Sequence, residues 1–249
     1  MNRFFVPAED VGENSIYMYD REDLHHMIKV LRLSAGDHVE ISDSVKWEYE
    51  AEIISLDKDQ AQLRILDKQK FTTEPDVNVT LFQGIPKQGK MELIVQKSVE
   101  LGVCSIVPVF MKRTVVADKG NFGKKTARWQ KVAAESVKQC KRGRIPEVSD
   151  PVRFPDMMSG LGKFDLVLFP YENEEGTTMK DVLRDFMFCG DHKNADIAVI
   201  IGPEGGFSDE EAAEIVSSGG RSLSLGKTTL RTETAGMAAI SMIMYEMEL

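Results

Sequence analysis

"IAVIIGPEGGFSDEEAAEIVSSGG", residues 197–220, decides the fold class. Its apolar first part, 197–201, predicts a strand, and a glycine-rich turn follows. Ser208 and Glu211 then form a capping box that opens a helix. A strand that passes through a short turn into a helix is the repeating unit of a parallel α/β sheet.

The same alternation runs from residue 77 to the end of the chain. Further strands are expected at 77–84, 105–110, 164–170 and 222–226, and further helices at 90–102, 127–140, 177–188 and 232–249. The predicted fold class is therefore α/β, a parallel sheet with helices on both faces. Ligands bind such sheets outside the carboxyl ends of the strands.

The first 71 residues have a different pattern, which predicts a small β-rich domain. "WEYEAEI" (47–53) alternates apolar and acidic residues, as a half-buried strand does, and 39–41 and 61–66 are further strands. The segment 20–33 predicts a helix with an apolar face, which Gly36 is expected to end. The segment 69–77 has few core residues and a proline, so we expect a linker there and domains at 1–71 and 72–249.

Composition limits the class of protein. The chain has 249 residues and is 42% hydrophobic, enough for one large or two medium domains. It has no apolar run of about 20 residues and no secretory leader, so we expect a cytoplasmic protein without membrane contact. The three cysteines and four histidines lack metal-ligand spacing, and we expect no metal.

Positive charge is concentrated in one part of an acidic chain. The formal net charge is -9, but residues 84–146 carry 14 Lys and Arg against 4 Asp and Glu. Such a block is typical of a surface that contacts phosphates. The simpler interpretation is a solvated helical face.

The turn "GPEGG", residues 202–206, is a poor phosphate cradle. It matches neither GxGxxG nor a P-loop, Glu204 brings a negative charge, and Pro203 lacks an amide donor. A positively charged ligand without phosphate, such as S-adenosylmethionine, fits better. The alternative is that the glycines only make a sharp turn.

A second glycine turn, "LGKTTLRTETAG" (225–236), is rich in polar residues. Thr232 or Thr234 suits the cap of the last helix. A capping role does not explain Arg231, which lies between an apolar stretch and the helix start. An arginine there suits a planar heterocycle or developing negative charge.

Several long motifs, in order, resemble the RsmE family of 16S ribosomal RNA methyltransferases, in the SPOUT superfamily. They are "GIPKQGKMELIVQKSVELGV" (84–103), "IGPEGGFSDEE" (201–211) and "LGKTTLRTETA" (225–235). "RFFV" (3–6), "HHMIKVLRLSAGD" (25–37) and "RWQKVAAESVKQCKR" (128–142) extend the resemblance over nearly the whole chain. Lys141 departs from it slightly, because a small residue is expected before the arginine.

The resemblance implies an architecture and an activity. Residues 1–71 would be a PUA-like β-barrel that binds RNA, and 72–249 a SPOUT domain with a C-terminal trefoil knot that holds S-adenosylmethionine. The protein would act as a homodimer and methylate N3 of a uridine in 16S ribosomal RNA, free or in the small ribosomal subunit.

The resemblance also implies site residues. The expected cofactor-binding residues are Phe169, Pro170, Tyr171, Glu172, Ile201, Gly202, Pro203, Glu204, Gly205, Gly206, Leu225, Gly226, Leu230, Thr232, Thr234 and Ala235. The expected RNA-binding residues are Arg3, His25, Arg32, Lys87, Lys90, Arg113, Arg128, Lys141, Arg142 and Arg144. His26 is expected to be structural.

Methylation at uracil N3 requires loss of the N3 proton or stabilisation of the anion. Arg231 is the expected catalytic cation. The proton acceptor is left open between Glu100, Glu233 and water. Two rival functions also stay open, a ribosome-assembly factor without catalysis and a methyltransferase for a ribose hydroxyl or a tRNA base.

Overall fold

The computed structural model describes residues 2–87, 89–117, 120, 122–190 and 192–248. The chain divides into two compact units, Met1–Glu74 with Val137–Ile145, and Pro75–Ser136 with Pro146–Leu249. The break at Glu74 lies just after the predicted boundary at residue 71. The return of 137–145 to the first unit has no counterpart in the predicted division.

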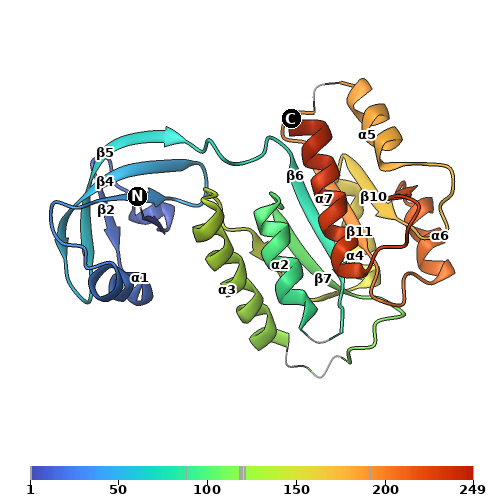
Figure 1. Ribbon diagram of the computed structural model, residues 1–249, viewed down its shortest axis with the longest axis horizontal. Helices are drawn as coiled ribbons and strands as arrows, with labels where there is room; N and C mark the ends of the chain where they lie inside the picture. Colours follow the sequence, from blue (N-terminus) through green and yellow to red (C-terminus); the bar gives the residue numbers. More distant parts are fainter. Residues whose placement is uncertain (1, 88, 118–119, 121, 191, 249) are drawn as a thin grey trace. The chain divides into compact units, whose positions relative to one another are not determined.

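Among the described residues, the first unit is built on a five-stranded sheet in the order β1-β3-β4-β5-β2. Figure 1 labels β2, β4 and β5 of this sheet. The strands are β1 (Arg3–Phe5), β2 (Ser15–Met18), β3 (His38–Ser42), β4 (Trp47–Leu56) and β5 (Ala61–Lys70). All neighbours are antiparallel except β1 and β3. The three predicted strands are confirmed as β3, β4 and β5.

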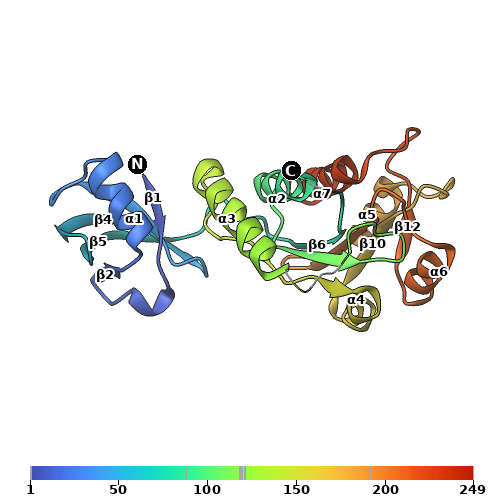
Figure 2. The ribbon, with the colours of Figure 1, turned by 90° about the horizontal axis from the view of Figure 1, so that it is seen from below.

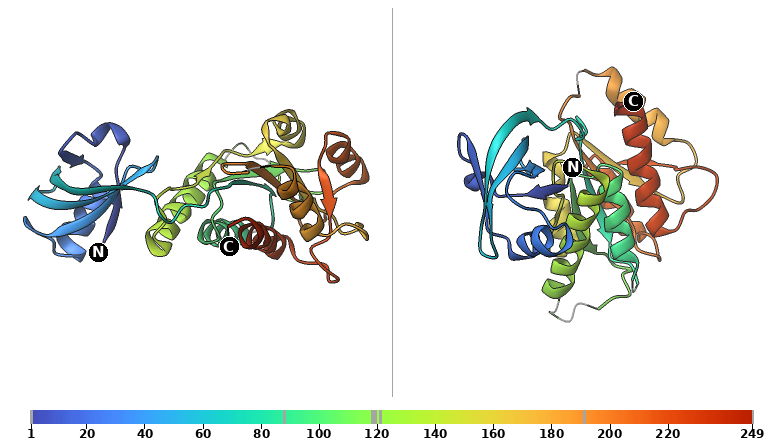
Figure 3. Two further views of the ribbon diagram at one scale, coloured as in Figure 1. Left: turned by 90° about the horizontal axis from the view of Figure 1, so that it is seen from above. Right: turned by 60° about the vertical axis from the view of Figure 1, so that its left-hand side comes forward.

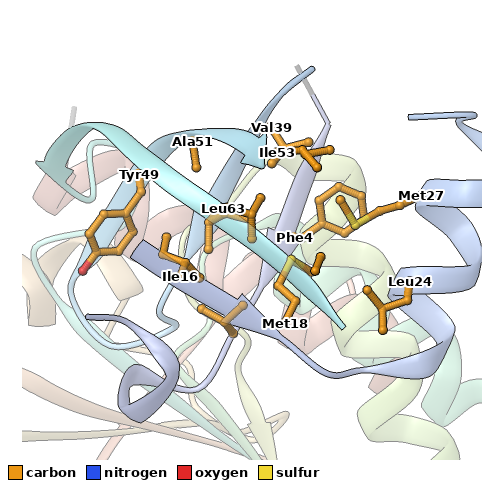
Figure 4. Close-up of a cluster of buried hydrophobic side chains, with 13 residues drawn as sticks. Phe4, Ile16, Met18, Leu24, Met27, Val39, Tyr49, Ala51, Ile53 and Leu63 are labelled. Carbon is orange, nitrogen blue, oxygen red and sulfur yellow. The ribbon is translucent and has the colours of Figure 1, made fainter. Parts of the chain in front are cut away.

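Alternating residues of these strands form the core of the first unit. Ile53 on β4 pairs with Leu63 on β5, and both side chains are fully buried. Figure 4 shows them in one cluster with Phe4, Leu24 and Met27. One face of the sheet and one face of the first helix therefore bury a common apolar cluster.

The first helix is shorter than the sequence pattern suggests. Helix α1 (Arg21–His25) is capped by Asp20, whose carboxylate accepts a hydrogen bond from the backbone N–H of Asp23. A π-helical turn over His26–Val30 follows it. The prediction that Gly36 ends the helix is wrong, because the chain already leaves the helix at Arg32, where φ is +57°.

The second unit contains the predicted parallel sheet. Among the described residues the sheet has seven strands, ordered β12-β10-β11-β6-β7-β8, with β9 beside β7, and every pairing is parallel. The strands are β6 (Asn78–Gly84), β7 (Ser105–Phe110), β8 (Glu147–Val148), β9 (Val152–Arg153), β10 (Leu166–Pro170), β11 (Asp196–Ile201) and β12 (Arg221–Leu223).

Helices cover both faces of this sheet, as predicted. They are α2 (Lys90–Glu100), α3 (Phe122–Cys140), α4 (Phe154–Ser159), α5 (Met179–Phe188), α6 (Asp209–Ser217) and α7 (Thr232–Glu248). Figures 2 and 3 show α2 and α7 on one face and α4 and α6 on the other. Residues 197–201 of the central strand β11 are consequently all buried.

Local signals for two helices are also confirmed. Ser208 and Glu211 make the reciprocal capping box of α6. On α3, Trp129, Ala133 and Val137 are buried along one face, although the helix begins at Phe122, before the predicted start. Within the described ranges, no helix has the length and apolarity needed to cross a membrane.

Candidate functional site

A cavity of about 1010 Å³ opens at the carboxyl ends of β10, β11 and β12. Three chain segments form most of its wall, drawn from 170–180, 201–207 and 224–232, and Lys90, Ala235 and Met242 complete it. These strands are neighbours in the parallel sheet, so their carboxyl ends meet at one edge. The cavity lies where ligands bind parallel α/β sheets.

Most of the predicted cofactor-binding residues line this cavity. They are Pro170, Tyr171, Glu172, Ile201, Gly202, Pro203, Glu204, Gly206, Leu225, Gly226, Leu230, Thr232 and Ala235. Phe169, Gly205 and Thr234 are not part of the lining. Phe169 is fully buried beneath Tyr171 and stacks on its ring, and Thr234 is exposed in the first turn of α7.

The glycines of the 202–206 turn are required by close packing and by backbone conformation. Gly206 has φ +66°, which side chains other than glycine rarely adopt. Gly205 faces away from the cavity, where its carbonyl accepts a hydrogen bond of 2.9 Å from Nη1 of Arg113. Gly84, at the end of β6, lies so close to the turn that a Cβ there would be 2.5 Å from the Pro203 nitrogen.

A buried chain of hydrogen bonds joins three segments beneath the cavity. The Gln83 amide Nε2 donates to Oγ1 of Thr232 at 2.8 Å, and Thr232 donates to the carbonyl of Gly202 at 2.6 Å. Thr232 therefore contributes structure at the cavity floor, because its hydroxyl already donates to protein. Gln83 is not among the predicted site residues, although an amide side chain within the apolar strand 77–84 is a visible signal in the sequence.

A cluster of three charged side chains lies at the wall of the cavity. The Lys90 ammonium is 3.2 Å from Oε1 of Glu204 and 3.0 Å from Oε2 of Glu233. The backbone N–H of Lys87 also donates to Glu204, at 3.0 Å. The cluster connects α2, the 202–206 turn and the start of α7.

The cluster favours the ionised form of all three groups. The hydrogen bond to Glu233 raises the pKa of Lys90 above its ordinary value. Partial burial raises the pKa of Glu233 and of Glu204, but hydrogen bonds from backbone N–H groups and from Lys90 outweigh it, so both pKa values lie below the ordinary carboxyl value.

Arg231 is an exposed residue on the cavity wall. Within the described part of the chain, no hydrogen bond or ion pair engages its guanidinium. Its charge helps to lower the pKa of Glu233, so the two side chains are near each other. The guanidinium is consequently available to a ligand.

The two carboxylates considered as proton acceptors are both engaged. Glu233 is held by Lys90, and Glu100 accepts two hydrogen bonds, of 2.9 and 2.7 Å, from the Lys97 ammonium on α2. Glu100 is also absent from the cavity lining. Among the described residues, no group of three His, Cys, Asp or Glu side chains is arranged to hold a metal.

A second set of polar contacts, made by Glu174, holds the part of the cavity wall that follows β10. Glu174 accepts hydrogen bonds from the Ser222 hydroxyl and from the backbone N–H groups of Gly176 and Thr177. The Ser222 hydrogen bond is the main cause of a lowered pKa at Glu174. The sequence pattern does not predict this contact, because Ser222 lies on β12, 48 positions after Glu174.

The predicted RNA-binding residues divide into exposed and engaged groups. In the first unit, His25, Arg32 and Lys141 are exposed, and Arg144 is half-buried. In the second unit, Lys87 is exposed, and Arg128 is exposed beside Glu92 at 3.2 Å, whereas Lys90 and Arg113 make the contacts described above. Lys119, which belongs to the same basic block, lies outside the described residues.

The structure argues against Arg142 and Arg3 as phosphate ligands. Arg142 is 5% exposed, and its Nη2 lies 2.7 Å from Oε2 of Glu74. Arg3 binds Glu40, Glu48 and the carbonyl of Lys141. Both side chains stabilise the first unit, because a buried charge needs its partners. His26, expected to be structural, packs edge-on against Phe4.

Comparison with known proteins identifies matches over both units. Residues 73–244 match the model of the RNA methyltransferase domain family, and 19–66 match that of the RNA methyltransferase PUA domain. Ribosomal RNA small subunit methyltransferase E of Bacillus subtilis is 29% identical, with 100% of this chain and 98% of the relative covered. Its counterpart in Buchnera aphidicola from Acyrthosiphon pisum is 30% identical, over 94% and 89%.

A solved structure agrees with these relatives. The Neisseria gonorrhoeae ribosomal RNA small subunit methyltransferase E, crystallised bound to S-adenosyl methionine, is 28% identical to this chain. It superposes with a TM-score of 0.82 and covers 98% of this chain and 97% of its own.

Proposed function

The chain belongs to the ribosomal RNA small subunit methyltransferase E family, and we propose that it transfers the methyl group of S-adenosylmethionine to N3 of a uridine in 16S ribosomal RNA. The observation that carries this proposal is the cavity at the carboxyl ends of β10, β11 and β12. It combines close glycine turns with an exposed arginine and four glutamates, Glu172, Glu174, Glu175 and Glu204.

These residues fit the proposed cofactor. The backbone of the 202–206 and 224–226 turns offers amides and carbonyls to an adenine, and apolar Leu225 and Ile201 flank them. Carboxylates on the wall suit a ligand that carries a sulfonium and an ammonium. When bound, S-adenosylmethionine supplies an electrophilic methyl group.

The residues of this chain then have to favour the N3 anion of the uracil. We assign that role to Arg231, whose guanidinium can present two donors to a carbonyl oxygen beside N3. Glu233 is a weak base in this arrangement, because Lys90 holds it ionised at a lowered pKa. The N3 proton is therefore best released to solvent, with Arg231 compensating the negative charge that develops.

The remaining expectations from the family are proposals of the same kind. The PUA-like domain, assigned to 1–71 and expected to be a β-barrel, would bind the RNA, and 72–249 would carry out the transfer. We also propose the C-terminal trefoil knot. Supporting it, the chain leaves edge strand β12 and returns as α7, which packs on α2 and on the central strands β6 and β11. Homodimer formation and a cytoplasmic location remain predictions.

Digestion of methylated RNA tests the proposed function. The protein would be incubated with radiolabelled S-adenosylmethionine and, in separate reactions, with small ribosomal subunits or free 16S ribosomal RNA that lack the modification, or with unmodified tRNA. The expected labelled nucleoside is 3-methyluridine. A 2′-O-methyl nucleoside or a labelled tRNA would favour the other methyltransferase, and absence of cofactor binding in calorimetry would favour an assembly factor.

A further inference from the structure

Lys90 has a place in the site that its predicted role as an RNA ligand does not explain. It is the first residue of α2 and follows Gly89, whose φ is +79°. Its side chain is only 30% exposed and ends between two carboxylates that are 24% and 14% exposed. A phosphate contact would have to replace both of these ion pairs.

The two carboxylates belong to the two segments that shape the cavity floor. Glu204 is the centre of the 202–206 turn, and Glu233 is the second residue of α7, two positions after Arg231. Like charges held this near each other repel strongly in a partly desolvated site. One ammonium that contacts both converts this repulsion into attraction and joins the turn to the helix.

Lys90 also differs from Arg231, the other cation on the same wall. The Arg231 guanidinium has no ion-pair partner in the described part of the chain, whereas the Lys90 ammonium has two at or below 3.2 Å. An ammonium with two carboxylate partners has little charge left for a developing anion. The geometry of Lys90 therefore suits a residue that positions Glu204 and Glu233 and does not itself contact the reacting atoms.

We propose that Lys90 is a positioning residue of the methyl-transfer site. It holds the 202–206 turn and the start of α7 in the arrangement that receives S-adenosylmethionine, with Arg231 beside it. This inference rests on the proposed function. It assigns to Lys90 the assembly of the cofactor site, through Glu204 and Glu233, and no contact with the reacting atoms.

Charge-compensating variants test this role. Lys90→Met should weaken the binding of S-adenosylmethionine by roughly tenfold in calorimetry, which corresponds to about 1.4 kcal/mol. The binding of S-adenosylhomocysteine, the product without the sulfonium charge, should weaken by the same factor. Lys90→Met combined with Glu233→Gln should bind within about threefold of the parent, because one carboxylate is then left without a competing charge.

Lys97→Met is the matched control, because Lys97 is also ion-paired on α2 but does not line the cavity. It should bind both ligands as the parent does. Failure of the parent itself to bind S-adenosylmethionine would overturn the proposed function, not this inference alone.

Three results would overturn the positioning role. The first is parent-like affinity in Lys90→Met. The second is selective strengthening of S-adenosylmethionine over S-adenosylhomocysteine, which would indicate that Lys90 only adjusts the potential in the cavity. The third is unchanged cofactor affinity with a hundredfold loss of kcat that the double variant does not rescue, which would make Lys90 a catalytic residue.

Discussion

Arg231 is the residue on which the proposed chemistry depends most directly. Arg231→Ala should reduce kcat for methyl transfer by roughly a hundredfold or more, the scale for loss of one positioned donor to a developing anion. The melting temperature should stay within a few degrees, because the side chain is exposed and unpaired in the described residues. Single-turnover kinetics and a thermal melt measure the two effects.

Arg231→Lys serves as the conservative companion to this variant. It should recover only part of the rate, because an ammonium does not present two coplanar donors. If Arg231→Ala retained nearly the parent rate, the cation that compensates the uracil anion would have to be another residue. Lys227, which also lines the cavity, would then be the first to examine.

Single residues also mark the limit of prediction from sequence. Motif position and chemistry predicted an arginine that faces a ligand, and Arg231 lies on the cavity wall. The same reasoning took Arg142 as a phosphate ligand, although Glu74 buries and neutralises it. The partner lies 68 positions away in the sequence, so no local pattern distinguishes this arginine from an exposed neighbour.

At the scale of elements, two glycines of the 202–206 turn have different roles: Gly206 lines the cavity, and Gly205 packs against Arg113. Gly206→Val should weaken S-adenosylmethionine binding by at least tenfold, because the residue lines the cavity and a Val at φ +66° costs roughly 1–3 kcal/mol of strain. Gly205→Val should act less on the cofactor and more on Arg113, whose Cβ would be 3.0 Å from the new one. Calorimetry on both variants measures the difference.

Gly219→Val separates backbone strain from a direct effect on the site. Gly219 has φ +92° just after α6 and is absent from the cavity lining, so its Val variant should lose stability but keep cofactor affinity. If Gly206→Val bound the cofactor as tightly as Gly219→Val does, the turn would not be a binding loop.

Long elements with a clear period were predictable, and short ones were not. All five predicted strands of the second unit are present, although β12 is Arg221–Leu223 where 222–226 was predicted. The other four are distinct apolar runs that contain or adjoin a glycine or proline. Strands β8 and β9 have two residues each, too few for any periodicity to be visible. Helix α4, with six residues, was missed for the same reason.

At the scale of the whole molecule, contacts between residues that are distant in sequence could not be predicted from local patterns. Alternation of strands and helices predicted the parallel sheet and the edge where the cavity lies. It did not predict that 137–145 would pack with the first unit, because that depends on contacts such as the Ser42 hydroxyl with the Gly143 carbonyl. The cluster of Lys90, Glu204 and Glu233 likewise joins residues that are distant in sequence.

Because residues 137–145 belong to the first unit, the predicted phosphate contacts of the basic block 84–146 can be tested separately within this segment. Lys141 and Arg144 belong to the unit that contains the PUA match, whereas Arg142 between them is buried. Replacing Lys141 and Arg144 together by Gln should weaken RNA binding and reduce the slope of log K against log salt by about 1.4 to 1.8, if each meets one phosphate. Arg142→Gln should instead lower the melting temperature, because the largely buried Glu74 carboxylate would lose this ion-pair partner and keep the backbone N–H donors of Gly143 and Arg144, while the slope of the folded protein stays unchanged. Fluorescence anisotropy with a fragment of 16S ribosomal RNA at several salt concentrations measures the slopes. An unchanged slope in the Lys141 and Arg144 variant would remove this segment from the RNA surface, and phosphate contacts would then be sought at His25 and Arg32, which are exposed in the same unit.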